Sequence, residues 1–195
     1  MKNIFLIGDS IRFGAEGSDG YGIHVAQKLA GKANVYAPEE NCRFAQYTLR
    51  YLHEWASKVD KDSIDIVHWN NGLWDTLRLF DDEPLTDIET YGVMLKRVYQ
   101  RIRLLFPNAK VIFALSTAVI EQWAKPAFFR CNSEIREYNR KAREVMEELG
   151  VEVNDLYTVS AGFDPSFHSD WVHFGTEGCK VLADAVIKAC FKDEE

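Results

Sequence analysis

Ile4-Phe5-Leu6-Ile7-Gly8-Asp9-Ser10 is the stretch that decides the fold. Its first four residues form a short run of branched and aromatic side chains, which is typical of a buried strand. Gly8 ends that run, and Ser10 follows two residues later. We therefore expect the Ser10 hydroxyl at the carboxyl edge of a sheet, where open α/β sheets bind their ligands. Taken alone, Ser10 is explained more simply as the cap of a following helix than as a nucleophile.

Strand and helix patterns alternate along the rest of the chain. Besides Ile4–Ile7, we expect strands at Asn34–Ala37, Ile64–Trp69, Lys110–Thr117 and Val151–Leu156. The expected helices are Gly20–Gly31, Cys42–Val59, Tyr91–Phe106, Ser133–Leu149 with Ser133 as its N-cap, and a last helix that begins near Gly175. The remaining long segments are expected to be loops, namely Asp75–Pro84, Ala118–Arg130 and the stretch from Leu156 to Gly175. This alternation predicts one parallel sheet covered by helices on both faces.

The composition fits one domain that spans residues 1–195, because 47% of the side chains are hydrophobic and suffice for one sizeable core. The net charge of −7, without a basic stripe, argues against nucleic acid as a partner. No apolar run approaches the roughly 20 residues of a membrane span. The four cysteines form no CxxC pair, so we expect reduced, structural thiols. The first strand begins by Asn3 and leaves no room for a signal peptide, so we expect a soluble cytoplasmic protein.

The loop before the last helix contains His168-Ser169-Asp170-Trp171-Val172-His173. A serine nucleophile needs a base that accepts its proton, and that base needs a carboxylate that fixes its tautomer. Asp170 and His173 are three residues apart, so a single turn can bring the carboxylate to the imidazole. If this loop lies beside the end of the first strand, His173 faces Ser10. The order Ser, Asp, His is one that such triads adopt.

Two other interpretations of this loop remain open. His168, Asp170 and His173 could bind a metal ion, although the other loops offer no matching His or Cys cluster. Alternatively, Asp170 could cap a helix while His173 only packs. The presence of Ser10 at the other end of the chain favours the triad over both, so we expect no metal site.

Gly8-Asp9-Ser10 near one end of the chain and Asp170-Trp171-Val172-His173 near the other resemble the SGNH (GDSL-type) hydrolase superfamily. The resemblance covers the whole chain. It implies a three-layer α/β/α sandwich with a five-stranded, flavodoxin-like sheet, no cofactor, and activity as an esterase, lipase, thioesterase or carbohydrate deacetylase. It also implies that Ser10 is the nucleophile, that His173 is the base and that Asp170 orients the base.

The middle motifs of that family match less well, and this affects the expected oxyanion hole. The family's glycine after the second strand is missing from Glu39-Glu40-Asn41-Cys42-Arg43. In Gly72-Leu73-Trp74-Asp75, Trp74 stands where the family has an oxyanion-binding asparagine. Because a tetrahedral intermediate needs preorganised donors, the candidates are the amides of Ser10, Cys42 and Arg43 and the side chains of Asn41, Asn70 and Asn71. The three asparagines could equally serve only to hold loops by turn hydrogen bonds.

Aromatic residues in the edge loops are the candidates for substrate binding. On the rim they could hold a sugar ring or an acyl group, although packing in the core or in a lid is the commoner role of such residues. These candidates are Trp74, Trp123, Phe128 and Trp171. Arg43 and Arg130 could bind an anionic substrate or pair with a glutamate.

The sequence therefore predicts a serine esterase that removes a small acyl group from a carbohydrate or a small metabolite. The preference for acetyl rests mainly on the family resemblance and on the short edge loops. The alternatives are a lipase or thioesterase that acts on longer acyl chains, and a non-catalytic carbohydrate-binding protein on the same scaffold. A nucleotide-binding protein is disfavoured, because the segment 8–14 contains neither a GxGxxG nor a GxxxxGK[ST] pattern.

Overall fold

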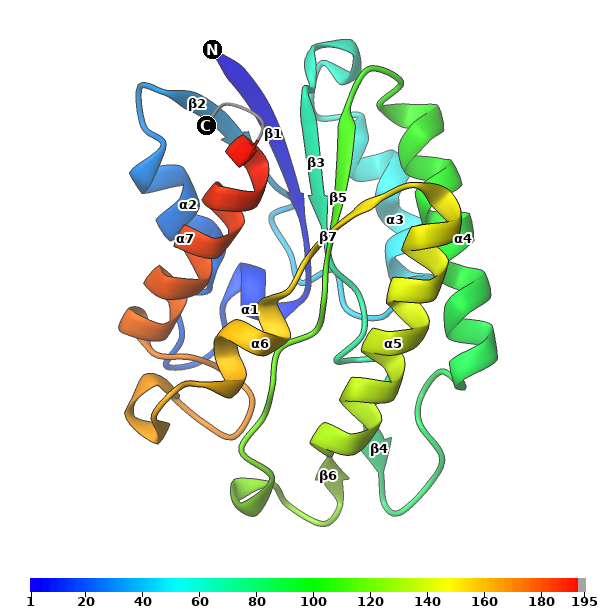
Figure 1. The fold of residues 1–195 in the computed structure, drawn as a ribbon, viewed down its shortest axis with the longest axis vertical. Coiled ribbons are helices and arrows are strands. Elements are labelled where there is room, and N and C mark those ends of the chain that lie inside the picture. The colour runs from blue at the N-terminus through cyan, green and yellow to red at the C-terminus, as the bar shows by residue number, and fades with distance from the viewer. Residues whose placement is uncertain (193–195) are drawn as a thin grey trace.

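The computed structural model describes residues 1–192 and contains a five-stranded parallel sheet in the order β2-β1-β3-β5-β7 (Figure 1). Its strands are β1 (Lys2–Ile7), β2 (Ala33–Tyr36), β3 (Ile66–Trp69), β5 (Lys110–Ala114) and β7 (Glu152–Asn154). Each predicted strand overlaps one of these, and the order is the flavodoxin-like one. The predicted fold class is confirmed. The chain order reverses between β1 and β3, so the carboxyl ends of these two strands flank the crevice where such sheets bind ligands.

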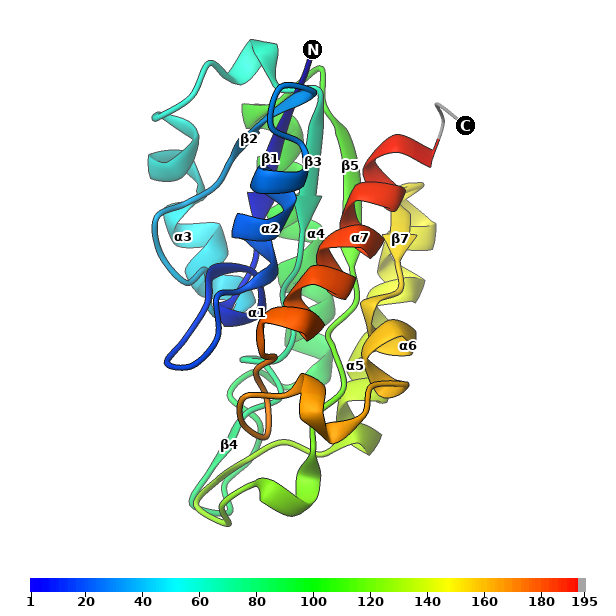
Figure 2. The same cartoon turned by 90° about the vertical axis from the view of Figure 1, so that its left-hand side faces the viewer.

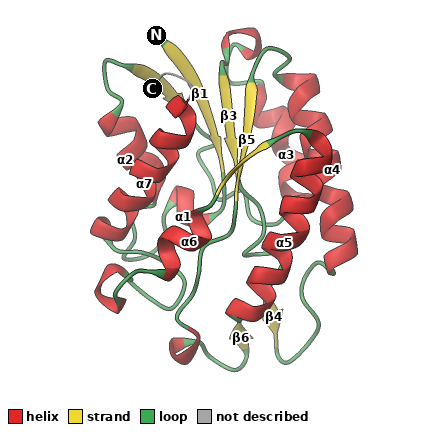
Figure 3. Ribbon diagram, in the orientation of Figure 1, coloured by secondary structure: helices red, strands yellow, loops and turns green. Residues whose placement is uncertain are grey.

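Helices cover both faces of the sheet, as Figures 1 and 3 show with the sheet between two groups of helices. On one face lie α2 (Tyr21–Lys28) and α7 (Thr176–Phe191), and on the other lie α3 (Ala45–Ala56), α4 (Ile88–Leu105) and α5 (Asn132–Leu149) (Figure 2). Alternate residues of each strand point to opposite faces. In β1, Phe5 and Ile7 therefore belong to the core beneath α3, α4 and α5, whereas Ile4 and Leu6 belong to the core beneath α2 and α7.

Several element boundaries differ from the prediction. The helix expected from Cys42 begins at Ala45. Ser133 is not the N-cap of α5, because that helix begins one residue earlier with Cys131 at the capping position. Two short helices lie where no helix was predicted: α1 (Ser10–Phe13) and α6 (Leu156–Ala161). Leu156 was assigned to a strand but starts α6, since the Asp155 side chain accepts the Thr158 N–H at 3.0 Å and caps the helix there. The chain also forms short 3₁₀ helices at Lys61–Ser63, Glu121–Trp123 and Pro165–Phe167.

Beyond the carboxyl edge of the sheet, two short strands pair with each other (Figures 1 and 3). They are β4 (Arg78–Leu79) and β6 (Phe128–Phe129), and their pairing is antiparallel. Both lie in segments that were expected to be irregular. We call the two segments that they join, residues 78–86 and 120–130, the edge flap. It extends the wall of the crevice away from the sheet.

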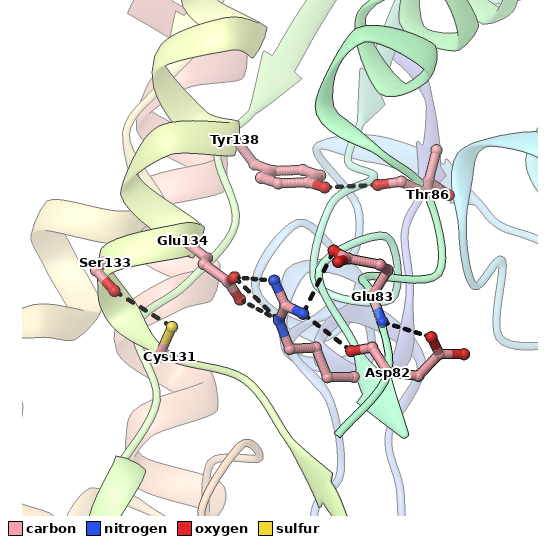
Figure 4. Close-up of polar contacts among 8 residues, drawn as sticks. Asp82, Glu83, Thr86, Cys131, Ser133, Glu134 and Tyr138 are labelled. Atoms are coloured by element: carbon pink, nitrogen blue, oxygen red, sulfur yellow. Dashed lines mark hydrogen bonds and ion pairs between the residues drawn. The ribbon is translucent and has the colours of Figure 1, made fainter. Parts of the chain in front are cut away.

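The edge flap is fastened to the first turns of α5 (Figure 4). Arg78 makes an ion pair that engages both oxygens of Glu134: Nη2 donates to Oε1 at 2.6 Å, and Nε lies 3.0 Å from Oε1 and 3.2 Å from Oε2. Its Nη1 also donates to the Asp82 carbonyl oxygen at 2.9 Å. One turn later, the Tyr138 hydroxyl donates to the Thr86 carbonyl oxygen at 2.6 Å. Bidentate arginine–carboxylate pairs are geometrically specific, so this contact fixes where the flap stands.

None of the helices in residues 1–192 has the length and apolar character needed to cross a membrane. All four cysteines are free thiols, as the sequence predicts.

Candidate active site

Ser10 lies directly after β1, on a turn that leaves no room for a side chain at position 8. A Cβ on Gly8 would stand 2.8 Å from the Arg12 Cβ. Asp9 caps α1, because its Oδ1 accepts the Ile11 N–H at 2.9 Å. Ser10 is then the first residue of α1 and is only 9% exposed. The hydroxyl is thus held at the crevice by the turn between β1 and α1.

Arg12 ties this turn to the loop that follows β2. Its buried guanidinium donates to the carbonyl oxygens of Pro38 and Glu40, at 2.9 and 2.6 Å. The Cys42 N–H donates to the Gly8 carbonyl oxygen at 3.1 Å. The two neighbouring edge loops therefore form one rigid unit around Ser10.

The loop before α7 forms a tight turn that brings its carboxylate to its imidazole. Asp170 Oδ1 accepts the backbone N–H groups of Val172 and His173, both at 2.7 Å. The turn closes where the Ser169 N–H donates to the His173 carbonyl oxygen at 3.0 Å. These bonds are local, which is why the three-residue spacing alone indicated the contact.

The structure brings Ser10, His173 and Asp170 together in a continuous hydrogen-bonded chain. His173 Nε2 lies 2.8 Å from Ser10 Oγ, and His173 Nδ1 lies 2.7 Å from Asp170 Oδ2. Both distances lie within the range that proton transfer requires. This arrangement can deprotonate a serine hydroxyl and hold the resulting imidazolium against a carboxylate.

Asp170 keeps its charge in this setting. Partial burial acts to raise the pKa of its carboxyl group, but hydrogen bonds from the His173 side chain and from the backbone of His173 and Val172 lower that pKa to about 2. The carboxylate is therefore ionised at neutral pH. An ionised partner stabilises the positive charge that His173 acquires when it accepts a proton.

His168 does not join His173 and Asp170 in a common cluster. Its ring packs against Phe174 with 4.6 Å between centroids, and burial lowers the pKa of its imidazole. Throughout residues 1–192, no three His, Cys, Asp or Glu side chains are grouped in a way that could hold a metal ion. The metal interpretation of this loop has no geometric support.

Most of the expected oxyanion donors are engaged in other hydrogen bonds. The Cys42 N–H bonds to Gly8, and the Arg43 N–H bonds to Asn41 Oδ1 at 2.8 Å. The Asn70 side-chain amide donates to the Ala114 carbonyl oxygen at 2.8 Å. The fully buried Asn71 donates to the Arg43 carbonyl oxygen and to Thr48 Oγ1, at 3.0 and 2.9 Å. Among these candidates, the Ser10 amide and the Asn41 side-chain nitrogen donate to no group in the part of the chain that the structure describes, since Asn41 uses only its Oδ1, as an acceptor.

Two buried carboxyl groups lie behind Ser10. Burial raises the pKa of Asp9, and burial together with the charge of Asp9 raises the pKa of Asp75 to about 7. Each has one oxygen, Oδ2, that accepts no hydrogen bond from described residues. Asp75 Oδ1 accepts the Ala45 N–H at 3.2 Å and so positions the start of α3. Burial therefore favours the protonated form of both carboxyl groups.

Arg130 is the residue whose position the sequence could not settle. It is 4% exposed, and its Nε donates to the Leu73 carbonyl oxygen in the loop after β3. Its guanidinium carbon lies 5.5 Å from the ring centre of Trp171 and 5.8 Å from that of Phe128. It forms no ion pair with a described Asp or Glu, in contrast to the pairing with a glutamate that was one of its two expected roles. Arg43, the other expected anion-binding residue, is exposed and stacks on Tyr47 at 4.8 Å.

Three of the four aromatic candidates line one pocket beside the triad. This pocket has a volume of about 560 Å³ and is formed by Trp123, Lys125, Phe128, Asp170 and Trp171. Phe128 and Trp171 meet edge to face, with centroids 6.1 Å apart. Trp74 is partly buried and is not among the lining residues. The edge flap contributes three of the five residues that line this pocket, which sequence patterns could not show because the strand pairing that forms the flap is long-range.

Comparisons with known proteins agree with this arrangement. The sequence profile of the GDSL-like lipase/acylhydrolase family matches residues 6–181. The human isoamyl acetate-hydrolyzing esterase 1 homolog is 28% identical over 197 aligned residues, which cover 92% of this chain and 77% of the human protein.

Solved structures of similar fold point the same way. A lipase/acylhydrolase from Enterococcus faecalis superimposes with a TM-score of 0.78 at 21% identity, over 100% of this chain and 97% of the other. The acetyl xylan esterase AlAXEase superimposes with a TM-score of 0.73 at 16% identity, over 96% of this chain and 98% of the other. At these identities the structural matches establish the fold.

Proposed function

Because this chain belongs to the GDSL-like lipase/acylhydrolase family and is a carboxylic ester hydrolase, we propose that it cleaves esters through a covalent acyl-enzyme on Ser10. The observation that carries the proposal is the hydrogen-bonded chain from Ser10 Oγ through His173 to Asp170. Activation of a serine by an adjacent base, which a third group orients, is the arrangement that this chemistry requires.

The reaction runs in two halves. His173 Nε2 accepts the Ser10 proton while Oγ attacks the ester carbonyl, and the tetrahedral intermediate places its negative charge on the former carbonyl oxygen. His173 then gives the proton to the departing alcohol, which leaves Ser10 acylated. In the second half His173 takes a proton from water, the resulting hydroxide attacks the acyl group, and the acid is released as Ser10 regains its proton. Asp170 stays ionised throughout and offsets the charge of His173.

For the substrate we propose a small acyl ester, with acetyl as the acyl group. The human relative carries the name of an enzyme that hydrolyses isoamyl acetate. The site adds a pocket with exposed aromatic faces, since Trp123 and Phe128 are 49% and 41% exposed. Such faces suit the stacking of a sugar ring or the packing of an apolar alcohol group.

The experiment compares acetyl release by the purified protein with that of Ser10→Ala. We expect the substitution to abolish turnover of p-nitrophenyl acetate above the buffer rate. Ser57→Ala, an exposed serine at the end of α3, is the matched control and should retain full activity. Equal rates for wild type and Ser10→Ala would refute the proposal.

A second candidate is a lipase or thioesterase, which the size of the aromatic pocket favours. A cavity of about 560 Å³ exceeds what an acetyl group alone requires. Comparing kcat/KM for p-nitrophenyl acetate and p-nitrophenyl octanoate separates the two. A preference for acetate supports the first candidate, and a strong preference for octanoate supports the second.

A further inference from the structure

The site lacks the side-chain oxyanion donor that the family has in the loop after β3. Trp74 stands where the family has an asparagine. The Asn70 and Asn71 side-chain amides already donate to other groups, and Asn41, on the loop after β2, accepts the Arg43 N–H through its Oδ1. Among the expected candidates this leaves two neutral donors without an acceptor in the described chain, the Ser10 amide and the Asn41 side-chain nitrogen, and each further donor adds separately to the rate.

Arg130 reaches the crevice from the edge flap and carries donors that no described group uses. Its Nε is bonded to Leu73, in the same loop that lacks the asparagine. No hydrogen bond of either Nη group to a described residue exists, and its guanidinium carbon lies 5.8 Å from the ring centre of Phe128 and 5.5 Å from that of Trp171. A guanidinium that is bonded through Nε to a carbonyl and packed against two aromatic rings, which themselves meet edge to face, is restricted in orientation while its Nη groups remain available as donors.

The charge of Arg130 acts on the nucleophile's turn. Burial lowers the pKa of its guanidinium to about 10, so it remains a cation at neutral pH. Among the cationic groups that lower the pKa of Asp9, Arg130 has a larger effect than His173, whose Nε2 lies 2.8 Å from Ser10 Oγ. A buried guanidinium without an ion-pair partner is costly for a fold, which is the kind of cost that proteins retain at functional sites.

We propose that Arg130 is the missing oxyanion donor: it is held through Nε by Leu73, and its free Nη groups donate to the negative oxygen of the tetrahedral intermediate on Ser10. This inference rests on the proposed function. Arg130 keeps all its protons during the reaction and only donates hydrogen bonds. A charged donor in a site shielded from water stabilises developing charge more than a neutral amide does, so Arg130 can replace the asparagine at position 74.

The first test uses a neutral ester, because a neutral ester presents no anion to Arg130 until the transition state. Arg130→Gln should lower kcat for p-nitrophenyl acetate by about 10²–10³-fold with KM changed by less than about threefold. Arg130→Lys keeps the charge but loses the planar fork whose separate nitrogens donate in fixed directions to Leu73 and to the oxyanion, so we expect a loss of at least about tenfold. Arg140→Gln is the matched control, because Arg140 lies on the exposed face of α5 and pairs with Glu144.

The second test uses the wild-type protein and does not depend on whether the variants fold. Methylboronic acid forms a tetrahedral adduct with an activated serine, and the adduct mimics the intermediate. In protein labelled with ¹⁵N-arginine, the Nη–H resonances of Arg130 should shift downfield on adduct formation and the resonances of Arg140 should not. An unchanged Arg130 spectrum with a formed adduct would overturn the inference.

The kinetic outcomes separate this inference from the proposed function. If Ser10→Ala is inactive while Arg130→Gln keeps kcat within about threefold of wild type, the inference fails and the proposed function stands. If Arg130→Gln raises KM only for the anionic ester p-nitrophenyl succinate, Arg130 anchors an anionic substrate and the inference also fails. A loss of kcat in Trp74→Phe without one in Arg130→Gln would assign the donor to the indole N–H and overturn it too.

Discussion

The two sides of Ser10 are built in different ways. On the base side, residues 167–175 form one continuous turn whose carboxylate, imidazole and closing hydrogen bonds lie within a few residues of one another. On the donor side, the loop after β3 meets Arg130 of the edge flap, 57 positions away in sequence. The base side is partly exposed, with 42% of the Asp170 side chain accessible, and the donor side is buried. This contrast indicates that the geometry of the base side can be predicted from a sequence motif, whereas the geometry of the donor side depends on tertiary packing.

The largest expected effect is on the base side. His173→Ala removes the only group within hydrogen-bond distance of Ser10 Oγ in the described chain, so kcat should fall by roughly 10⁴–10⁶-fold. The measurement is steady-state hydrolysis of p-nitrophenyl acetate. His53→Ala, an exposed histidine on α3, is the matched control. A loss below tenfold would mean that Ser10 has another base.

Asp170→Asn should have the next largest effect. The amide can no longer stabilise the imidazolium, and it favours the wrong tautomer of His173, so kcat should fall by about 10³–10⁴-fold. Because hydrogen bonds hold the pKa of Asp170 at about 2, wild-type activity should show no loss from protonation of this group above about pH 4. If Asp170→Asn keeps more than a tenth of the wild-type kcat, Asp170 is a cap and not a catalytic partner.

On the donor side, Asp75 makes stability depend on pH. Burial raises the pKa of Asp75 from an ordinary value of 3.8 to about 7. Between these values the folded protein holds a proton that the unfolded chain releases, so this group's contribution to stability falls as pH rises from about 4 to about 7. Asp75→Asn should remove that fall. The loss of unfolding free energy between pH 5 and pH 8 should therefore be smaller in the variant than in wild type, by on the order of 2 kcal/mol.

Urea unfolding of wild type and Asp75→Asn at several pH values between 5 and 8 measures this change. Asp81→Asn is the control, because Asp81 is exposed and its left-handed backbone (φ 65°) suits asparagine. If the free energy of unfolding depends on pH in the same way for wild type and Asp75→Asn, the pKa of Asp75 is not raised in the folded protein. That result would contradict the prediction.

The smallest expected effect concerns the fastening of the edge flap. Glu134→Gln removes the carboxylate that accepts hydrogen bonds from two nitrogens of Arg78. The free energy of unfolding should fall by about 1 kcal/mol. Because the flap carries Phe128 and Arg130, KM and kcat should both change by a few-fold. Glu144→Gln, in the exposed pair with Arg140, should leave all three quantities unchanged. Identical kinetics in both variants would show that the flap is positioned without the Arg78–Glu134 pair.

The sequence indicated the base side and the sheet because their signals are local. Short apolar runs marked the five strands, and the spacing of Asp170 and His173 marked the turn that joins them. The edge flap was missed because β4 and β6 have two residues each and owe their pairing to partners far away in sequence. Ser133 was expected to cap α5, but the Asn132 side chain bonds both the N–H and the carbonyl oxygen of Val119, and this long-range tether accompanies a helix start one residue earlier.

The asparagines of the donor side show the same limit. Their residue type suited either an oxyanion donor or a loop fastener, and only packing could choose between these roles. Asn71 lies fully buried among Trp69, Thr48 and the Arg43 backbone, all of which it bonds. The position of Arg130 over Trp171 could not be foreseen either, since it requires the flap to fold back over the loop before α7.

Covalent labelling of a single residue tests most directly whether Ser10 is an activated nucleophile. The wild-type protein is incubated with a fluorophosphonate probe at pH 8, digested, and analysed by mass spectrometry. We expect one phosphonylated site, Ser10, with labelling lost in Ser10→Ala and slowed at least about 10³-fold in His173→Ala. Labelling at another residue, or equal labelling rates in wild type and His173→Ala, would contradict it.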